Sequence, residues 1–428
     1  MLQSTHVIPG LVLREHRFTL PLDYANPGAT IEVFAREVIA PGKQEAKQPY
    51  LVFLQGGPGS GSPRPMGNSG WIKRALQDYR VLLLDQRGTS LSTPITAQTL
   101  KSLGSAEQQA AYLMHFRADS IVNDAEAIRA ELIGDAEWSI LGQSYGGFCA
   151  LRYLSVAPEG LREVLITGGI PSLTRPTDDI YRATYPRVIA KNARYYQRYP
   201  DDAPRVRELV QHLLANEVMM PSGGRLTAQR FLQLGLQLGM SDGFEAIHYL
   251  LEETWVHDAG GARELNWNFL LHLEQLQSFD TNPIFSLLHE ACYTQQAASN
   301  WSAQRLLADY PEFSLDGEQV LFTGEMIYPW MFDTYPQLQP LKGAAEILAR
   351  TAAWPMLYDL AVLKHNRVPV AAAVYDDDMY VHREFSEETA RQVPNMKLWL
   401  TNQYEHNGLR ADGEAVLGRL IAMVRGEA

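Results

Sequence analysis

The first side chain with clear chemical potential is a serine at the end of an apolar run. Ser144 is the central residue of Gly-Gln-Ser-Tyr-Gly at residues 142–146, which follows the strand-like run 138–141 and precedes a helical pattern. Gly-x-Ser-x-Gly between a strand and a helix is typical of the nucleophile elbow, a tight turn that lifts a reactive hydroxyl above a sheet. An ordinary flexible turn can carry the same residues, so the context decides. If Ser144 is a nucleophile, the chain must also supply a base and an acid.

A histidine after the last apolar strand is the best candidate for the base. A serine hydroxyl becomes a strong nucleophile when a neutral imidazole accepts its proton, and a carboxylate must orient that imidazole. Among eleven histidines, His406 stands in a glycine-containing loop directly after the predicted strand 396–400. His382 is the competing candidate, but it lies on a predicted helix where it would face away. We therefore predict that His406 is the base.

Three adjacent carboxylates are candidates for the acid. Asp376, Asp377 and Asp378 follow the apolar run 369–375, so serine, acid and histidine occur in the chain order expected of a triad on a mostly parallel sheet. The spacing alone does not choose among the three. They could also mark a metal site, but no second cluster of ligands with suitable spacing lies nearby. The sequence therefore predicts chemistry without a metal or a cofactor.

A glycine-rich loop follows another buried strand. The apolar run 50–54 leads into Gln-Gly-Gly-Pro-Gly-Ser-Gly at residues 55–61, where main-chain amides can point at one spot without side chains between them. A phosphate-binding loop would need Gly-Lys-Ser/Thr, which is absent, and a dinucleotide fingerprint would need a third glycine where Arg64 stands. An oxyanion-hole loop after a strand fits these residues better than either alternative.

Strands and helices alternate over most of the chain. Apolar strand patterns occur at residues 12–20, 30–39, 50–54, 81–84, 138–141, 164–167, 369–375 and 396–400. This alternation is typical of a mostly parallel sheet flanked by helices, with functional loops at the carboxyl ends of the strands. Between residues 173 and 345 the alternation is lost, and amphipathic helical patterns take its place at 206–215, 226–238, 244–253 and 268–276. We therefore predict a first core part over 1–172, a large, mainly helical domain inserted after the sixth strand over 173–345, and a second core part over 346–428.

The composition limits the classes of partner. The 428 residues are 46% hydrophobic and carry a formal net charge of -12. This balance indicates a globular chain with a large core and argues against binding to nucleic acid or to an anionic membrane surface. The first residues lack a signal-peptide pattern, and no apolar run reaches the ~18 residues that a membrane span requires. The two cysteines, Cys149 and Cys292, do not imply a disulfide framework, so we expect a cytoplasmic protein.

Taken together, the motifs resemble those of the proline iminopeptidase (prolyl aminopeptidase) family of α/β-hydrolase-fold serine peptidases. The resemblance rests on residues 55–59, on Asp-Gln-Arg-Gly-Thr-Ser-Leu-Ser at 85–92, on 142–147, and on the late aspartate and histidine. It covers nearly the full length, and the chain is most similar to the longer bacterial members. The chain departs from the family at Gln55, where the glycine loop usually begins with histidine, and at Ser90, where glycine is usual. The resemblance implies an α/β-hydrolase fold whose inserted helical domain is a cap.

The resemblance also implies an activity and assigns residues to it. The expected reaction releases N-terminal proline from small peptides through an acyl-enzyme intermediate, with Ser144 as the nucleophile and His406 as the base. Asp378 becomes the acid because it falls three residues past the position where the family has glycine in Gly-x-x-Asp. The main-chain amides of Gly57 and Tyr145 would form the oxyanion hole.

An aminopeptidase must also hold the charged amino end of its substrate, and in this family glutamates of the cap have that role. Glu290 and Glu325 stand in apolar or aromatic surroundings in the sequence, where a solvated surface charge is less expected. Both are therefore candidates for binding the substrate amino group. The competing interpretation is that both are salt-bridged structural acids.

Two other functions fit the same scaffold. A general esterase or lipase acting on small acyl esters would use the same triad without needing the glutamates, and a catalytically silent binding protein would keep the fold without the reaction. An epoxide hydrolase or dehalogenase is disfavoured because such enzymes place aspartate where Ser144 stands. The sequence makes no prediction of the oligomeric state.

Overall fold

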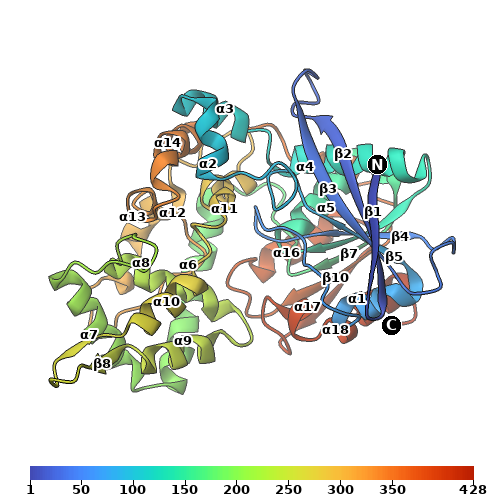
Figure 1. Ribbon diagram of the computed structural model, residues 1–428. Coiled ribbons are helices and arrows are strands. Elements are labelled where there is room, and N and C mark those ends of the chain that lie inside the picture. Colours follow the sequence, from blue (N-terminus) through green and yellow to red (C-terminus); the bar gives the residue numbers. More distant parts are fainter.

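A nine-stranded sheet organises the structure. The computed structural model describes residues 1–428, and its strands lie in the order β1-β2-β3-β5-β4-β6-β7-β10-β11 (Figure 1). Strands β5 to β11 of this order run parallel, whereas β1, β2 and β3 add an antiparallel edge. The strands are β1 (Leu2–Ile8), β2 (Leu11–Pro21), β3 (Thr30–Ile39), β4 (Tyr50–Leu54), β5 (Arg80–Leu84), β6 (Trp138–Gln143), β7 (Leu161–Thr167), β10 (Val370–Tyr375) and β11 (Met396–Thr401).

Helices cover both faces of the sheet because its central strands are apolar on both faces. In β4, successive side chains point to opposite faces, so Phe53 belongs to one hydrophobic cluster and Val52 to the other. The helices are α1 (Gly70–Asp78) and α18 (Gly413–Arg425) on the face of Phe53, and α4 (Ala118–Ile133) and α5 (Tyr145–Val156) on the face of Val52.

The mostly parallel sheet flanked by helices confirms the predicted architecture, with one strand more than expected. The additional strand, β1, lies at the edge of the sheet, and six of its seven residues are exposed. It therefore has no buried face that an apolar pattern could mark. Because of this extra strand, the helical insertion follows the seventh strand of the chain, β7, and not the sixth.

The segment between β7 and β10 is built mainly of helices, which Figure 1 shows gathered to one side of the sheet. A short antiparallel hairpin of β8 (Trp255–His257) and β9 (Arg263–Leu265) interrupts them, and no sequence pattern indicates it. In place of one helix over 226–238, the structure has α8 (Ala228–Leu232) and a 3-10 segment, Gln233–Gly239. The other α-helices of the segment are α6 (Thr177–Arg198), α7 (Asp202–Ala215), α9 (Gly243–Glu252), α10 (Trp267–Leu276), α11 (Pro283–Leu288), α12 (Ser302–Leu306), α13 (Met331–Thr334), α14 (Lys342–Arg350) and α15 (Leu360–Leu363).

Short helices of the core meet the inserted segment. Helix α3 (Ala106–Leu113), which follows α2 (Ala97–Leu100), packs against α14, and the two lie side by side in Figure 1. After β10 and β11 come α16 (Arg383–Gln392) and α17 (Gly408–Ala411). No helix in the structure combines the length and the apolar character that crossing a bilayer requires.

Candidate active site

Ser144 lies in a tight turn between β6 and α5. Its backbone has φ 52° and ψ -123°, a conformation that costs energy for a residue with a side chain and that occurs mainly at functional sites. A Cβ atom at Gly142 would lie 2.5 Å from the carbonyl oxygen of Gly146, and one at Gly146 would lie 1.9 Å from that of Leu54. Both positions therefore require glycine, and the turn holds Ser144 at the carboxyl edge of the sheet.

The serine is the first member of a chain of hydrogen bonds. Ser144 Oγ lies 2.9 Å from His406 Nε2, and His406 Nδ1 lies 2.7 Å from Asp378 Oδ2. The other oxygen of Asp378 accepts the main-chain N–H groups of Tyr380 at 2.9 Å and Val381 at 3.1 Å. With Asp378 accepting from Nδ1–H, Nε2 is free to accept the serine proton. The structure thus brings together three residues that are separated by up to 262 positions in the chain.

The environment of His406 tunes its basicity. Burial of the ring acts to lower its pKa, but the adjacent Asp378 carboxylate acts in the opposite direction, and the resulting pKa of His406 is raised above its ordinary value. The carboxylates of Glu325 and Glu405 contribute in the same direction as Asp378. The imidazolium that forms when His406 accepts a proton is therefore stabilised by its surroundings.

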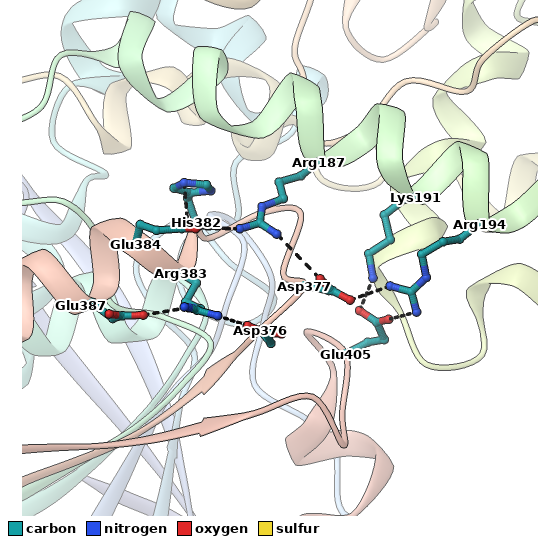
Figure 2. A network of polar contacts seen from close by, with 10 residues as sticks. All are labelled: Arg187, Lys191, Arg194, Asp376, Asp377, His382, Arg383, Glu384, Glu387 and Glu405. Atoms are coloured by element: carbon teal, nitrogen blue, oxygen red, sulfur yellow. Dashed lines mark hydrogen bonds and ion pairs between the residues drawn. The ribbon is translucent and has the colours of Figure 1, made fainter.

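The two other candidates for the acid face away from the histidine. Asp376 pairs with Arg383, and Asp377 Oδ2 lies 2.7 Å from Arg194 Nη1 (Figure 2). Asp378, by contrast, is buried with a side chain only 1% exposed. The geometry therefore selects Asp378 from the three aspartates, a choice that the spacing leaves open.

His382, the competing candidate for the base, takes no part in this chain. His382 directly precedes α16, and its Nε2 lies 2.9 Å from a carboxylate oxygen of Glu384 in the first turn of that helix. Burial lowers the pKa of His382 below its ordinary value. The prediction that it faces away from Ser144 agrees with this placement.

The two predicted oxyanion-hole residues lie beside the serine. Gly57 and Tyr145 line the same small cavity as Ser144. Tyr145 is the first residue of α5, and the N–H groups of the first turn of a helix have no partner within the helix. Amides from the glycine loop and from this helix N-terminus are therefore available at the point where negative charge would develop on an attacked carbonyl.

Residues of the inserted segment also line this cavity. Glu325, His289 and Tyr293 line it together with Ser144. The carboxylate of Glu325 lies 3.5 Å from His289 Nε2, and the hydroxyl of Tyr181 lies 3.2 Å from His289 Nδ1. The structure therefore places the carboxylate of Glu325 in the same cavity as Ser144.

Glu290, the other predicted contact for the substrate amino group, does not line the cavity at Ser144. Its two carboxylate oxygens accept the main-chain N–H groups of Ser302 at 3.2 Å and Ala303 at 3.0 Å, at the start of α12. It lines a different cavity, beside Trp301 and Trp354. Burial raises the pKa of Glu290, but these amide contacts favour the charged form. Glu290 is thus a structural acid that caps a helix, although no salt bridge holds it.

A network of ion pairs connects the inserted segment to both loops that carry the triad partners. Figure 2 shows cations of α6 facing these loops: Lys191 Nζ lies 2.5 Å from Glu405, and Arg194 contacts both Asp377 and Glu405. Asp377 directly precedes Asp378, and Glu405 directly precedes His406. The main-chain N–H of His406 itself donates to the carbonyl of Gly239 in the inserted segment, at 3.1 Å.

The sequence analysis does not identify several residues that lie next to the site in the structure. His289 and Tyr293 lie close to Glu290 in the chain, but the sequence analysis names only Glu290 in this segment. Lys191 and Arg194 lie on a helix rich in charged residues, where they look like solvated groups, yet the Lys191 side chain is only 3% exposed. The spacing of 191 and 194 on one helical face is the one signal that could have indicated a common partner.

Comparison with known families gives one matching model. Residues 49–409 match the family model described as the alpha/beta hydrolase fold. This range begins at the strand before the glycine loop, includes the whole inserted segment, and ends just after His406.

Individual relatives match over nearly the full length. The chain is 49% identical over 423 residues to a proline iminopeptidase of Aeromonas sobria, covering 98% of each chain. It is 38% identical to the proline iminopeptidase aneH of Aspergillus aculeatus, covering 96% of this chain and 93% of the relative. A crystal structure of proline iminopeptidase from Mycobacterium smegmatis aligns with 96% of this chain and 98% of its own, at 13% identity and a TM-score of 0.47.

Proposed function

Because this chain belongs to the proline iminopeptidase family of α/β hydrolases and is a prolyl aminopeptidase, we propose that Ser144, His406 and Asp378 form its catalytic triad. The observation that carries this proposal is the unbroken hydrogen-bonded chain from the Ser144 hydroxyl through His406 to the Asp378 carboxylate. Its substrates are peptides with N-terminal proline.

The reaction follows from the positions of these groups. Ser144 Oγ attacks the prolyl carbonyl carbon while His406 Nε2 accepts the hydroxyl proton, and Asp378 stabilises the imidazolium. The amides of Gly57 and Tyr145 donate to the carbonyl oxygen as it becomes negative. His406 then protonates the leaving amine, which departs as the shortened peptide. A water molecule, deprotonated by His406, hydrolyses the prolyl ester of Ser144 and releases proline.

Glu325 gives the enzyme its requirement for a free amino end. An N-terminal proline carries a charged secondary amine with two N–H donors, and a carboxylate is its natural partner. Glu325 shares the cavity of Ser144 and is backed by His289, so it lies within the space that the prolyl group must occupy. A peptide with further residues before the proline would bring an uncharged amide nitrogen to this carboxylate. The cavity would also have no room for those additional residues.

The inserted segment acts as a cap domain over residues 173–345, between core parts 1–172 and 346–428. Its role as a cap is supported by Glu325, His289 and Tyr293, which it contributes to the cavity at Ser144. We place the enzyme in the cytoplasm, and this is supported by its two free, buried cysteines, Cys149 and Cys292.

One pair of substrates tests the proposed function. We expect steady hydrolysis of prolyl-p-nitroanilide, at least about 100-fold loss of kcat/KM when the prolyl nitrogen is acetylated, and no turnover by Ser144→Ala. Circular dichroism of Ser144→Ala controls for its folding. Comparable turnover of the free and acetylated substrates would contradict the role of Glu325 and indicate a general acyl hydrolase.

A further inference from the structure

Two glutamine side chains stand next to each other at the carboxyl edge of the sheet. Strands β4 and β6 are neighbours, with Leu54 opposite Gly142, so Gln55 and Gln143 follow as the next pair. Gln143 Oε1 lies against the glycine loop, 2.6 Å from where a Cβ of Gly56 would be. Both side chains are half-buried, and neither carboxamide makes a hydrogen bond to the protein. Two carboxamides without protein partners beside a nucleophile are available to bind substrate.

Both glutamines line a cavity that is distinct from the one at Ser144 and larger than it. It has a volume of about 610 Å³, and its wall includes His406 and, from the cap, Gln237. The Gln237 side chain donates to the carbonyl of Leu276 at 3.2 Å, which leaves its oxygen as a free acceptor. The cavity is therefore bordered by three glutamine carboxamides and by the proposed base, and it is open to solvent.

The direction of the reaction assigns the two cavities to the two halves of the substrate. His406 must protonate the leaving amine, so the chain beyond the scissile bond has to lie on the side of the imidazole. The cavity at Ser144, with Glu325 at its end, is not lined by His406, whereas the larger cavity is. The prolyl group and the leaving peptide thus have separate places on either side of the scissile bond.

We propose that the larger cavity is the binding site for the leaving peptide, and that Gln55 and Gln143 bind the main chain of the residues that follow the proline. The inference rests on the proposed function and adds its leaving-group specificity. A carboxamide offers one acceptor oxygen and two N–H donors, which match the C=O and N–H of a peptide unit whatever its side chain. Gln55 is also a position at which this chain departs from the family pattern, in which the glycine loop usually begins with histidine.

The wild-type enzyme provides a first test that needs no variant. Peptide units placed after the proline fill the cavity, so kcat/KM should rise about fivefold or more from Pro-Gly-amide to Pro-Gly-Gly-Gly-amide, as each added unit gains hydrogen bonds. A constant or falling kcat/KM along this series would overturn the proposal. No turnover of prolyl-p-nitroanilide would instead overturn the proposed function itself, so the two failures are distinguishable.

Variants then locate the effect. For each variant we compare kcat/KM for Pro-Gly-Gly-amide with kcat/KM for prolyl-p-nitroanilide, which has no peptide unit after the proline. We expect Gln55→Leu and Gln143→Leu to lower the ratio of the first value to the second about fivefold each, because only the peptide substrate loses hydrogen bonds to the carboxamide. The ratio cancels changes in folding or in the amount of active serine, which matters for Gln143 beside Ser144. Gln77→Leu, the same change on the exposed surface of α1, is the matched control and should leave the ratio unchanged. An unchanged ratio in both test variants would refute the assignment.

Discussion

At the scale of single residues, Asp378 differs from its two neighbours in what its carboxylate contacts. It accepts from His406 and from two main-chain amides, whereas Asp376 and Asp377 face arginines. We expect Asp378→Asn to lower kcat for prolyl-p-nitroanilide about 10,000-fold, because a carboxamide cannot hold the imidazole in the tautomer that accepts the serine proton. Steady-state kinetics measures this loss, and Asp376→Asn, the matched control, should change kcat less than about tenfold.

We expect the same residue to set the pH dependence of the reaction. The Asp378 carboxylate outweighs the effect of burial and raises the pKa of His406. Since the neutral imidazole is the active form, kcat/KM falls as the pH drops through this pKa. In Asp378→Asn the carboxylate is gone and burial favours the neutral ring, so the acidic limb of the residual activity should move to lower pH. A limb that stays in place or moves to higher pH would contradict this assignment of the acid.

The two candidate glutamates allow a matched comparison. We expect Glu325→Gln to lower kcat/KM for prolyl-p-nitroanilide about 10-fold to 100-fold, mainly through KM, because the charged amino end loses its carboxylate. Glu290→Gln should keep kcat/KM and instead lower the free energy of unfolding by about 1 kcal/mol, because the amides at the start of α12 lose a charged acceptor. Urea unfolding measures the second effect. The reverse outcome, a stable but slow Glu290→Gln, would restore Glu290 to the site.

Residue types and their positions after strands are enough to predict Ser144 and His406 as a pair. Residue types and positions do not choose among the three consecutive aspartates, because that choice depends on how the loop turns after β10. Glu290 and Glu325 have similar surroundings in the sequence, but the donors to Glu290, the main-chain amides of Ser302 and Ala303, become its neighbours only when the chain folds back. Sequence patterns describe local surroundings, and contacts of this kind are not local.

At the scale of elements, helix α6 joins the cap to the loops of the triad. Lys191 is nearly buried and pairs with Glu405, the residue before His406 (Figure 2). We expect Lys191→Met to lower kcat for prolyl-p-nitroanilide about tenfold with little change in KM, because the histidine loop loses its anchor while the prolyl cavity keeps its walls. Lys191→Arg should restore most of the loss, since it keeps the charge.

A second lysine on another helix provides the control for this prediction. Lys73 of α1 pairs with Glu414 of α18 at 3.0 Å, and both side chains are about half exposed. Lys73→Met should leave kcat and KM unchanged, because an exposed ion pair contributes little and Lys73 pairs with Glu414 of α18 and not with a residue next to His406 or Asp378. Equal losses in Lys73→Met and Lys191→Met would mean that α6 has no special part in positioning His406.

The elements that the sequence pattern predicts are those with a clear apolar period. The central strands are apolar throughout, and the amphipathic helices α7, α9 and α10 show one buried stripe. Strand β1 has no buried face, and each strand of the β8–β9 hairpin has only three residues. Neither therefore shows a periodic apolar pattern in the sequence. The helix expected over 226–238 changes to 3-10 geometry after Leu232. Within the 3-10 segment, Gly235 packs so closely that a Cβ would lie 1.8 Å from the carbonyl oxygen of Thr323.

At the scale of the whole molecule, the sequence predicts where the insertion lies but not how it is fixed to the core. The loss of strand and helix alternation marks the segment, because alternation is a local property. The docking depends on side chains that reach across the boundary from distant positions. Buried arginines at such positions are hard to recognise, since arginine in a sequence usually indicates the surface.

Arg117 is the clearest of these docking residues. It precedes α4 in the core, its side chain is fully buried, and its guanidinium donates to the carbonyls of Thr294 and Pro355 at 2.7 Å each and of Ala291 at 3.3 Å. We expect Arg117→Leu to lower the free energy of unfolding by about 3 kcal/mol, because three carbonyls, two of them in the buried residues Ala291 and Thr294, lose their donor. Urea unfolding measures this loss against Arg419→Leu, an exposed control that should change by less than about 0.5 kcal/mol. Equal stability of the two variants would mean that the cap docks through its apolar contacts alone.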